Sequence, residues 1–120
     1  MTNLIIWSKD RACQLHLLLE SIQKFSNKTF GNVFIIYTYS NNEFKKGYDA
    51  LKTRFPNFEF KFETSFKDDT IAFLHRPADN IAFSTDDTVI FKSVTQDGIK
   101  LKPNEVFSLR LGLNTLIQDC

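Results

Sequence analysis

The sequence lacks any apolar stretch that approaches the roughly 18–20 residues needed to span a membrane. Its first ten residues, MTNLIIWSKD, have neither the basic start nor the extended apolar core of a signal peptide. Only two cysteines are present, Cys13 and Cys120, and they lie at opposite ends of the chain and fit no metal-ligand spacing. We therefore expect a cytoplasmic protein with free thiols and no transmembrane segment.

The sequence also lacks an excess of charge of either sign. Fifteen Lys and Arg residues nearly balance fourteen Asp and Glu residues, which leaves a formal net charge of +1. Proteins that bind nucleic acid usually carry a basic patch or stripe, because contacts with phosphate supply much of their affinity. The sequence shows no such stripe, and we expect no nucleic-acid partner.

What the sequence does contain is a regular alternation of strand and helix patterns. Short apolar or alternating runs predict strands at residues 3–8, 32–39, 57–63 and 80–84. Apolar residues at helical spacing predict helices at residues 9–25, 44–55 and 67–76. A chain of 120 residues suits one domain, residues 1–120. The β-α-β-α-β-α-β order predicts an α/β fold, a three-layer α/β/α sandwich on a mostly parallel sheet.

Several residues at the ends of these segments predict local structure. Asp10 stands where the cap of the first helix belongs, since its side chain can accept from the free amides of the first turn. Residues 40–42, Ser-Asn-Asn, offer the same chemistry to the second helix, which Pro56 ends. Phenylalanines alternate with charged residues over residues 57–63, which predicts a strand near a sheet edge with one wet face. A further helix is predicted at residues 102–112.

Polar residues follow three of the predicted strands. Asp10 follows the first, Ser40 the second, and the adjacent carboxylates Asp86 and Asp87 follow the strand at residues 80–84. Ligands of parallel α/β sheets bind beyond the carboxyl ends of the strands, near the switch in strand order. Carboxylates there can hold Mg²⁺ or Mn²⁺ against a diphosphate, whereas a solvated turn explains the pair from local sequence alone. Adjacent extended residues point to opposite faces, so one carboxylate is expected to bind metal and the other a sugar hydroxyl.

Three segments in order resemble nucleotide-diphospho-sugar transferases of the GT-A fold, such as family 2 glycosyltransferases. Residues 5–22, IIWSKDRACQLHLLLESI, resemble the opening strand, loop and helix of that family. Residues 81–91, IAFSTDDTVIF, resemble its D-x-D segment, and residues 104–114, NEVFSLRLGLN, resemble a segment that some members carry later. The likeness spans nearly the whole chain. A strict D-x-D would need a carboxylate at Thr85 or Thr88, so the sequence departs from the pattern of metal ligands.

The resemblance implies a glycosyltransferase, or its donor-binding part, that moves a sugar from a nucleotide-diphosphate donor to an acceptor not named by the sequence. It implies nucleotide contacts at Ser8, Asp10, Arg11, Tyr39, Ser40 and Asp86. It implies Mn²⁺ or Mg²⁺ as cofactor, with Asp87 as the first choice of ligand and Asp86 as the second. Domains of this fold usually continue beyond this length with an acceptor site and a catalytic base. We therefore expect this chain to be the donor-binding half of a longer protein.

A non-catalytic nucleotide-binding or interaction domain is the main alternative, and donor binding without turnover would favour it. A receiver domain needs acidic residues at the end of its first strand, where this chain has Ser-Lys-Asp at residues 8–10. Glu59 and Lys61 match part of a nuclease motif. The Asp that such a motif needs before them would be Asp49, which falls inside a predicted helix.

Overall fold

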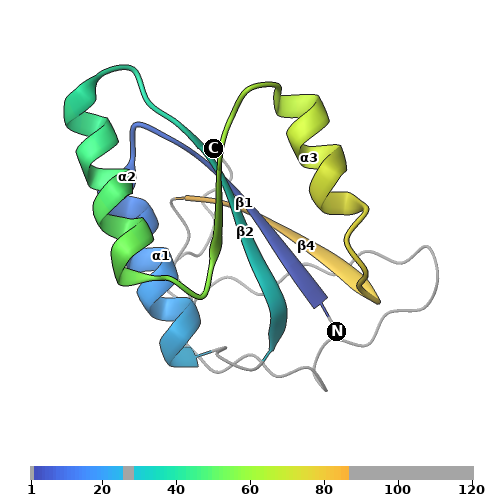
Figure 1. Cartoon of the computed structure of the whole chain (residues 1–120). Coiled ribbons are helices and arrows are strands. Elements are labelled where there is room, and N and C mark those ends of the chain that lie inside the picture. The colour runs from blue at the N-terminus through green and yellow to red at the C-terminus, as the bar shows by residue number, and fades with distance from the viewer. Residues whose placement is uncertain (1, 26–28, 87–120) are drawn as a thin grey trace, which may run out of the picture.

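In the computed structural model, which describes residues 2–25 and 29–86, a parallel β-sheet alternates with helices (Figure 1). The elements are β1 (Thr2–Lys9), α1 (Ala12–Phe25), β2 (Phe30–Thr38), α2 (Asn42–Arg54), β3 (Glu59–Phe62), α3 (Phe66–Leu74) and β4 (Asn80–Thr85). This order confirms the predicted alternation and the α/β class. The helix predicted at residues 102–112 lies outside the described residues, as does Asp87.

The sheet has the strand order β3-β2-β1-β4, and every recorded strand pair is parallel. The chain steps from β1 to β2 and β3 in one direction and then returns past β1 to β4. The strand order therefore switches beside β1, and β3 is an edge strand of the described sheet, as predicted. The carboxyl ends beside this switch are where ligands bind in open α/β sheets.

Helices lie on both faces of the sheet, α1 and α2 on one face and α3 on the other (Figure 1). Crossovers between parallel strands are right-handed. Because the chain reverses its direction along the sheet between β3 and β4, the helix that connects them, α3, lies on the opposite face from α1 and α2. None of the helices in the described part of the chain is long and apolar enough to cross a membrane.

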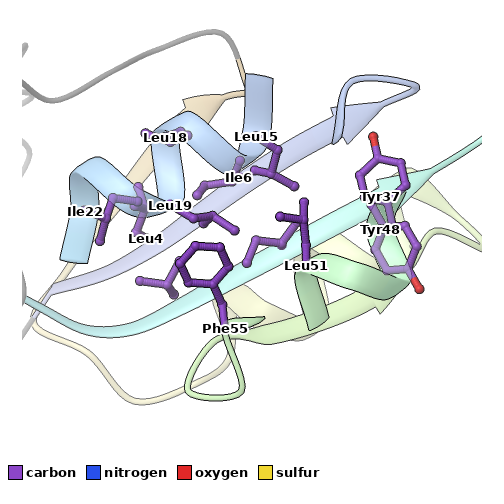
Figure 2. Packing of buried hydrophobic residues seen from close by; sticks show 12 residues of the cluster. Leu4, Ile6, Leu15, Leu18, Leu19, Ile22, Tyr37, Tyr48, Leu51 and Phe55 are labelled. Carbon is purple, nitrogen blue, oxygen red and sulfur yellow. The ribbon is translucent and has the colours of Figure 1, made fainter. Parts of the chain in front are cut away.

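The larger hydrophobic core lies between the sheet and the pair α1 and α2 (Figure 2). Its buried residues are Leu4, Ile6, Leu15, Leu18, Leu19, Ile22, Val33, Ile35, Tyr37, Tyr48, Leu51 and Phe55. The four residues from α1 belong to the predicted helical stripe, each at most 2% exposed. Because side chains alternate along a strand, the intervening residues Ile5, Phe34 and Ile36 face α3 instead, where they pack with Phe73.

The alternation predicted for β3 is present, but α3 partly covers its charged face. Lys61 lies 3.9 Å from the buried carboxylate of Asp69, and Glu59 accepts a hydrogen bond from Arg76 at 3.0 Å. Asp49 lies inside α2, as predicted. The Glu and Lys that matched part of a nuclease motif therefore form ion pairs that attach α3 and Arg76, two residues beyond its end, to the edge strand.

Candidate functional site

The carboxyl ends of β1, β2 and β4 lie along one edge of the sheet. In the strand registers Lys9 pairs with Thr38, and Trp7 pairs with Thr85. The residues that follow these strands, Asp10, Ser40 and Asp86, are thus brought to a common edge, which confirms the prediction made from the strand ends. Two clusters of polar contacts form there, one between β1 and β4 and the other between β1 and β2.

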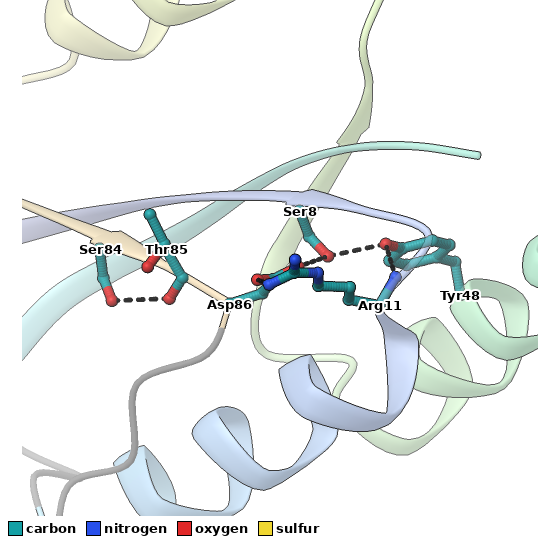
Figure 3. Close-up of polar contacts among 6 residues, drawn as sticks. All are labelled: Ser8, Arg11, Tyr48, Ser84, Thr85 and Asp86. Atoms are coloured by element: carbon teal, nitrogen blue, oxygen red, sulfur yellow. Dashed lines mark hydrogen bonds and ion pairs between the residues drawn. The ribbon is translucent and has the colours of Figure 1, made fainter. Parts of the chain in front are cut away.

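The first cluster, called here the β1–β4 junction, consists of Ser8, Arg11, Tyr48 and Asp86 (Figure 3). The Asp86 side chain is only 7% exposed. Its Oδ2 accepts a hydrogen bond from Ser8 Oγ at 2.8 Å, and its Oδ1 lies 3.8 Å from Nη1 of Arg11. The guanidinium side of this pair is open to solvent, because the Arg11 side chain is 55% exposed. A buried anion is thus joined to an exposed cation that a ligand can reach.

Tyr48 extends this network from α2. Its hydroxyl lies 2.7 Å from Ser8 Oγ and accepts a hydrogen bond from the Arg11 backbone N–H at 3.1 Å. Since Ser8 has a single hydroxyl proton and gives it to Asp86, Tyr48 must donate to Ser8. Three hydrogen bonds therefore point in one direction, from the Arg11 amide through two hydroxyls to the carboxylate. Bonds arranged in such a series polarise and strengthen one another.

The environment of Tyr48 favours the protonated form of its hydroxyl. Burial raises the pKa of Tyr48 above its ordinary value of 10.0, the hydrogen bonds with Ser8 and Arg11 offset part of that rise, and the negative charge of Asp86 adds to it. The tyrosine is fully buried. A close approach of α1 and α2 accompanies this position, since a Cβ added to the neighbouring Gly47 would lie 2.8 Å from Cβ of Ala12.

The second cluster, called here the β1–β2 junction, consists of Asp10 and Ser40. The Asp10 carboxylate accepts from the Ser40 backbone N–H at 2.7 Å and from its hydroxyl at 2.6 Å. Asp10 has a φ of 55°, a left-handed conformation that Asp adopts more readily than most residues. Its own N–H donates to the Thr38 carbonyl at 3.3 Å, which ties the loop after β1 to the end of β2.

The prediction that Asp10 caps α1 is therefore wrong. Helix α1 begins at Ala12. The Leu15 amide donates to the Arg11 carbonyl at 3.0 Å, so Arg11, and not Asp10, is the residue that precedes the first helical turn. Both carboxylate oxygens of Asp10 are instead used on Ser40, because the left-handed turn directs the residue toward β2. The corresponding prediction for α2 is confirmed, since the Asn41 side chain accepts from the amide of its first turn.

Tyr39 follows β2 and packs against Phe62, the last residue of β3. Its ring centroid is 5.0 Å from that of Phe62 and 6.4 Å from that of Tyr37. It is half-buried and packs against the larger core. The structure thus places Tyr39 beside Ser40 on the same edge, but no recorded contact joins its ring to Asp10 or Asp86. Its contact with a nucleobase remains a prediction.

The metal predicted from the acidic pair depends partly on Asp87, which lies outside the described residues. Within residues 2–25 and 29–86 no group of three or more His, Cys, Asp or Glu side chains could hold a metal ion. The Asp86 oxygens already have partners, Ser8 on Oδ2 and the Arg11 guanidinium 3.8 Å from Oδ1, so a cation would compete with the Arg11 contact. Mn²⁺ or Mg²⁺ therefore remains a prediction.

Sequence reasoning placed Tyr48 only in the apolar stripe of α2. The sequence did offer one signal that Tyr48 has a polar role: it is a tyrosine where the other positions of the stripe are leucine or phenylalanine, and a buried phenol needs a hydrogen-bond partner.

A shallow pocket of about 140 Å³ lies elsewhere, lined by residues at the start of β2 and the end of α1 such as Phe30 and Ile22. That pocket is at the amino edge of the sheet and includes none of the predicted site residues.

The described fold is an α/β domain with a parallel sheet, compatible with a Rossmann-like or GT-A-like domain. The chain is similar to the bifunctional glycosyltransferase pgtA of Dictyostelium discoideum, with 33% identity over 97 residues. The similar region covers 73% of this chain and 13% of that protein, so the chain spans only a small part of its relative's length. No family model and no solved structure matches the chain.

Proposed function

We propose that this chain is the donor-binding part of a glycosyltransferase and that its sheet and helices form a three-layer α/β/α sandwich of the GT-A type. The observation that carries the proposal is the β1–β4 junction. A buried carboxylate, Asp86, ends the strand beside the switch in strand order and is tied to Ser8 and the exposed Arg11. The similarity to a glycosyltransferase supports the same class of reaction.

The ligand proposed for this edge is a nucleotide-diphosphate sugar. Arg11 is suited to its diphosphate, since a guanidinium forms strong, charge-assisted hydrogen bonds with phosphate oxygens and this one is largely exposed. Asp10 offers a carboxylate that can accept hydrogen bonds from ribose hydroxyls in place of Ser40, as acidic residues do in other nucleotide-binding sheets. Tyr39 and Ser40 would border the base.

A divalent cation, Mn²⁺ or Mg²⁺, is proposed to bind between the diphosphate and Asp87, with Asp86 as the second ligand. When bound, the ion would neutralise the negative charge of the leaving diphosphate. At Asp86 the ion would compete with the contact that Arg11 makes to Oδ1. The hydroxyl of Thr85, at the place of the other carboxylate in the usual motif, is a weaker ligand for a hard cation.

Donor binding without transfer is the function proposed for the chain by itself. Transfer requires an acceptor held in line with the anomeric carbon, and such positioning contributes roughly 7–11 kcal/mol. An inverting enzyme also needs a base for the acceptor proton. A non-catalytic nucleotide-binding domain is the second candidate. The observation that favours it is that Ser8 and Arg11 already contact both oxygens of Asp86, so the carboxylate has partners without a metal.

The test is calorimetry of the purified chain with UDP, GDP and ADP, each with and without Mn²⁺. We expect one nucleotide to bind, more tightly with the ion, and Asp87→Ala to remove the gain that the ion produces. Asp49→Ala is the matched control, because Asp49 lies on the exposed surface of α2 and pairs only loosely with Lys52, at 4.0 Å. Equal affinity with and without Mn²⁺ would contradict the metal and favour the non-catalytic domain.

A second measurement separates binding from transfer. The chain is incubated with radiolabelled nucleotide sugars, and transfer to acceptors is scored apart from hydrolysis of the donor. Donor binding with no transfer is the expected result. Absence of binding to every nucleotide would overturn the proposed function, whereas robust transfer would show that the chain itself holds an acceptor site and a base.

A further inference from the structure

We infer that Tyr48 is a positioning residue for the donor diphosphate, acting on Asp86 through Ser8 and on Arg11 through its backbone. The inference rests on the proposed function of the same edge. Tyr48 has an exposure of 0%, so it cannot touch a ligand itself. Its effect must pass through the two residues that its hydroxyl contacts.

One arm of this arrangement leads to the carboxylate. Tyr48 donates to Ser8 Oγ at 2.7 Å, and this leaves the serine proton directed at Asp86 Oδ2 at 2.8 Å. Without the phenol, Ser8 would still donate to Asp86, but its oxygen would lose the donor that polarises it and fixes its position, so the carboxylate would be held less firmly. The orientation of the carboxylate that faces Arg11 is thus set from α2.

The other arm leads to the cation. The Arg11 backbone N–H donates to the Tyr48 hydroxyl at 3.1 Å, just before α1 begins. This bond fixes the backbone of Arg11, from which the exposed guanidinium extends. Arg11 directly follows Asp10, the residue with the left-handed conformation. Both charged groups of the β1–β4 junction therefore depend on one hydroxyl. Ligand-contacting groups generally need such supporting contacts to keep a productive geometry.

The hydroxyl is separable from the packing role of the ring. The Tyr48 ring stacks on Tyr37 with centroids 4.8 Å apart, and a phenylalanine would keep that contact (Figure 2). Tyr37 is the matched control, because it is 4% exposed, belongs to the same core and has no recorded hydrogen bond from its hydroxyl within the described residues. Removing either hydroxyl leaves an aromatic ring in the same stack.

The experiment compares the full chain with Tyr48→Phe and Tyr37→Phe. Each is titrated with UDP, GDP and ADP by calorimetry and with the parent nucleosides by NMR, at a temperature where circular dichroism shows all three folded. We expect Tyr48→Phe to weaken nucleoside diphosphate binding by about tenfold, the lower end of the loss caused by removing supporting contacts in metal sites. Nucleoside binding should change less than about twofold, and Tyr37→Phe should alter neither affinity appreciably.

The outcomes separate this inference from the proposed function. If the unmodified chain binds no nucleoside diphosphate, both fail. If it binds one and Tyr48→Phe binds it equally well, only the positioning role fails. A parallel loss of nucleoside and diphosphate affinity would show a general structural defect and would also overturn the inference. Should Tyr48→Phe not fold, Ser8→Ala breaks the carboxylate arm with the tyrosine intact, and it must show the same diphosphate-specific loss.

Discussion

The β1–β4 junction and the β1–β2 junction each place an aspartate at the same edge of the sheet, in contrasting surroundings. Asp86 is 5% exposed and is held by Ser8 and Arg11, contacts that come from the neighbouring strand and the loop after it. Asp10 is half-buried, and the partner that occupies both of its oxygens, Ser40, is exposed.

The difference in burial indicates that the fold depends on the contacts of Asp86, whereas a ligand could replace those of Asp10. A buried carboxylate without partners is costly, so Asp86 is expected to have a partner on each oxygen whenever the chain is folded. The hydrogen bonds of Asp10 compete with water and therefore contribute less to stability. We expect a ligand hydroxyl to take the place of Ser40 at little cost, whereas Asp86 is buried and already bonded to Ser8.

The largest expected effect is the difference between Asp86→Asn and Asp10→Asn in the free energy of unfolding. Asp86→Asn removes the charge that Arg11 faces and brings an amide into a buried network, which should cost about 2–3 kcal/mol. Asp10→Asn should cost less than about 1 kcal/mol, because its site is wetter and Asn also tolerates positive φ. Urea unfolding followed by circular dichroism measures both. Equal losses would mean that burial does not distinguish the two junctions.

The serines extend the comparison to the partners of the two carboxylates. Ser8→Ala leaves the Tyr48 hydroxyl without its acceptor and Asp86 without its donor, both in buried surroundings, and should cost about 1–2 kcal/mol. Ser40→Ala removes one exposed hydroxyl and leaves the backbone N–H bonded to Asp10, so about 0.5 kcal/mol or less is expected. The same unfolding measurement applies. A larger loss of unfolding free energy for Ser40→Ala than for Ser8→Ala would show that the fold depends more on the β1–β2 junction than on the β1–β4 junction.

The smallest expected effect is the pH dependence that Tyr48 gives to the β1–β4 junction. Its pKa is raised by burial, so above pH 10 the unfolded chain loses this proton before the folded chain does. The stabilisation is therefore complete below pH 10 and is lost as the pH rises through the raised value. Unfolding midpoints between about pH 8 and pH 11 should fall more steeply for the unmodified chain than for Tyr48→Phe. Tyr39→Phe is the control and should behave like the unmodified chain, because Tyr39 is half-buried, follows β2 and packs against Phe62 of β3.

The fold was largely accessible from the sequence because its signals are short-ranged. The stripe of α1, the alternation of β3 and the cap at Asn41 involve residues within a few positions of one another. Periodicity of 3.6 or 2 residues determines which side chains must be buried together, and it does so without knowledge of distant partners. The shared edge of Asp10, Ser40 and Asp86 also followed, since strands that are all parallel end on the same side.

The contacts within that edge were decided by the tertiary structure. Asp10 looked like a helix cap because a cap needs a partner only a few residues away, yet its partner is 30 residues along the chain. Tyr48 looked like an ordinary core residue, although it lies 40 positions from the serine that it contacts, and Asp86 lies 78 positions from the same serine. The sequence by itself determined which elements form and at which edge their polar ends gather. Which hydroxyl meets which carboxylate depended on strand order and helix packing, because hydrogen bonds act over about 3 Å and nothing in local sequence specifies separations so small.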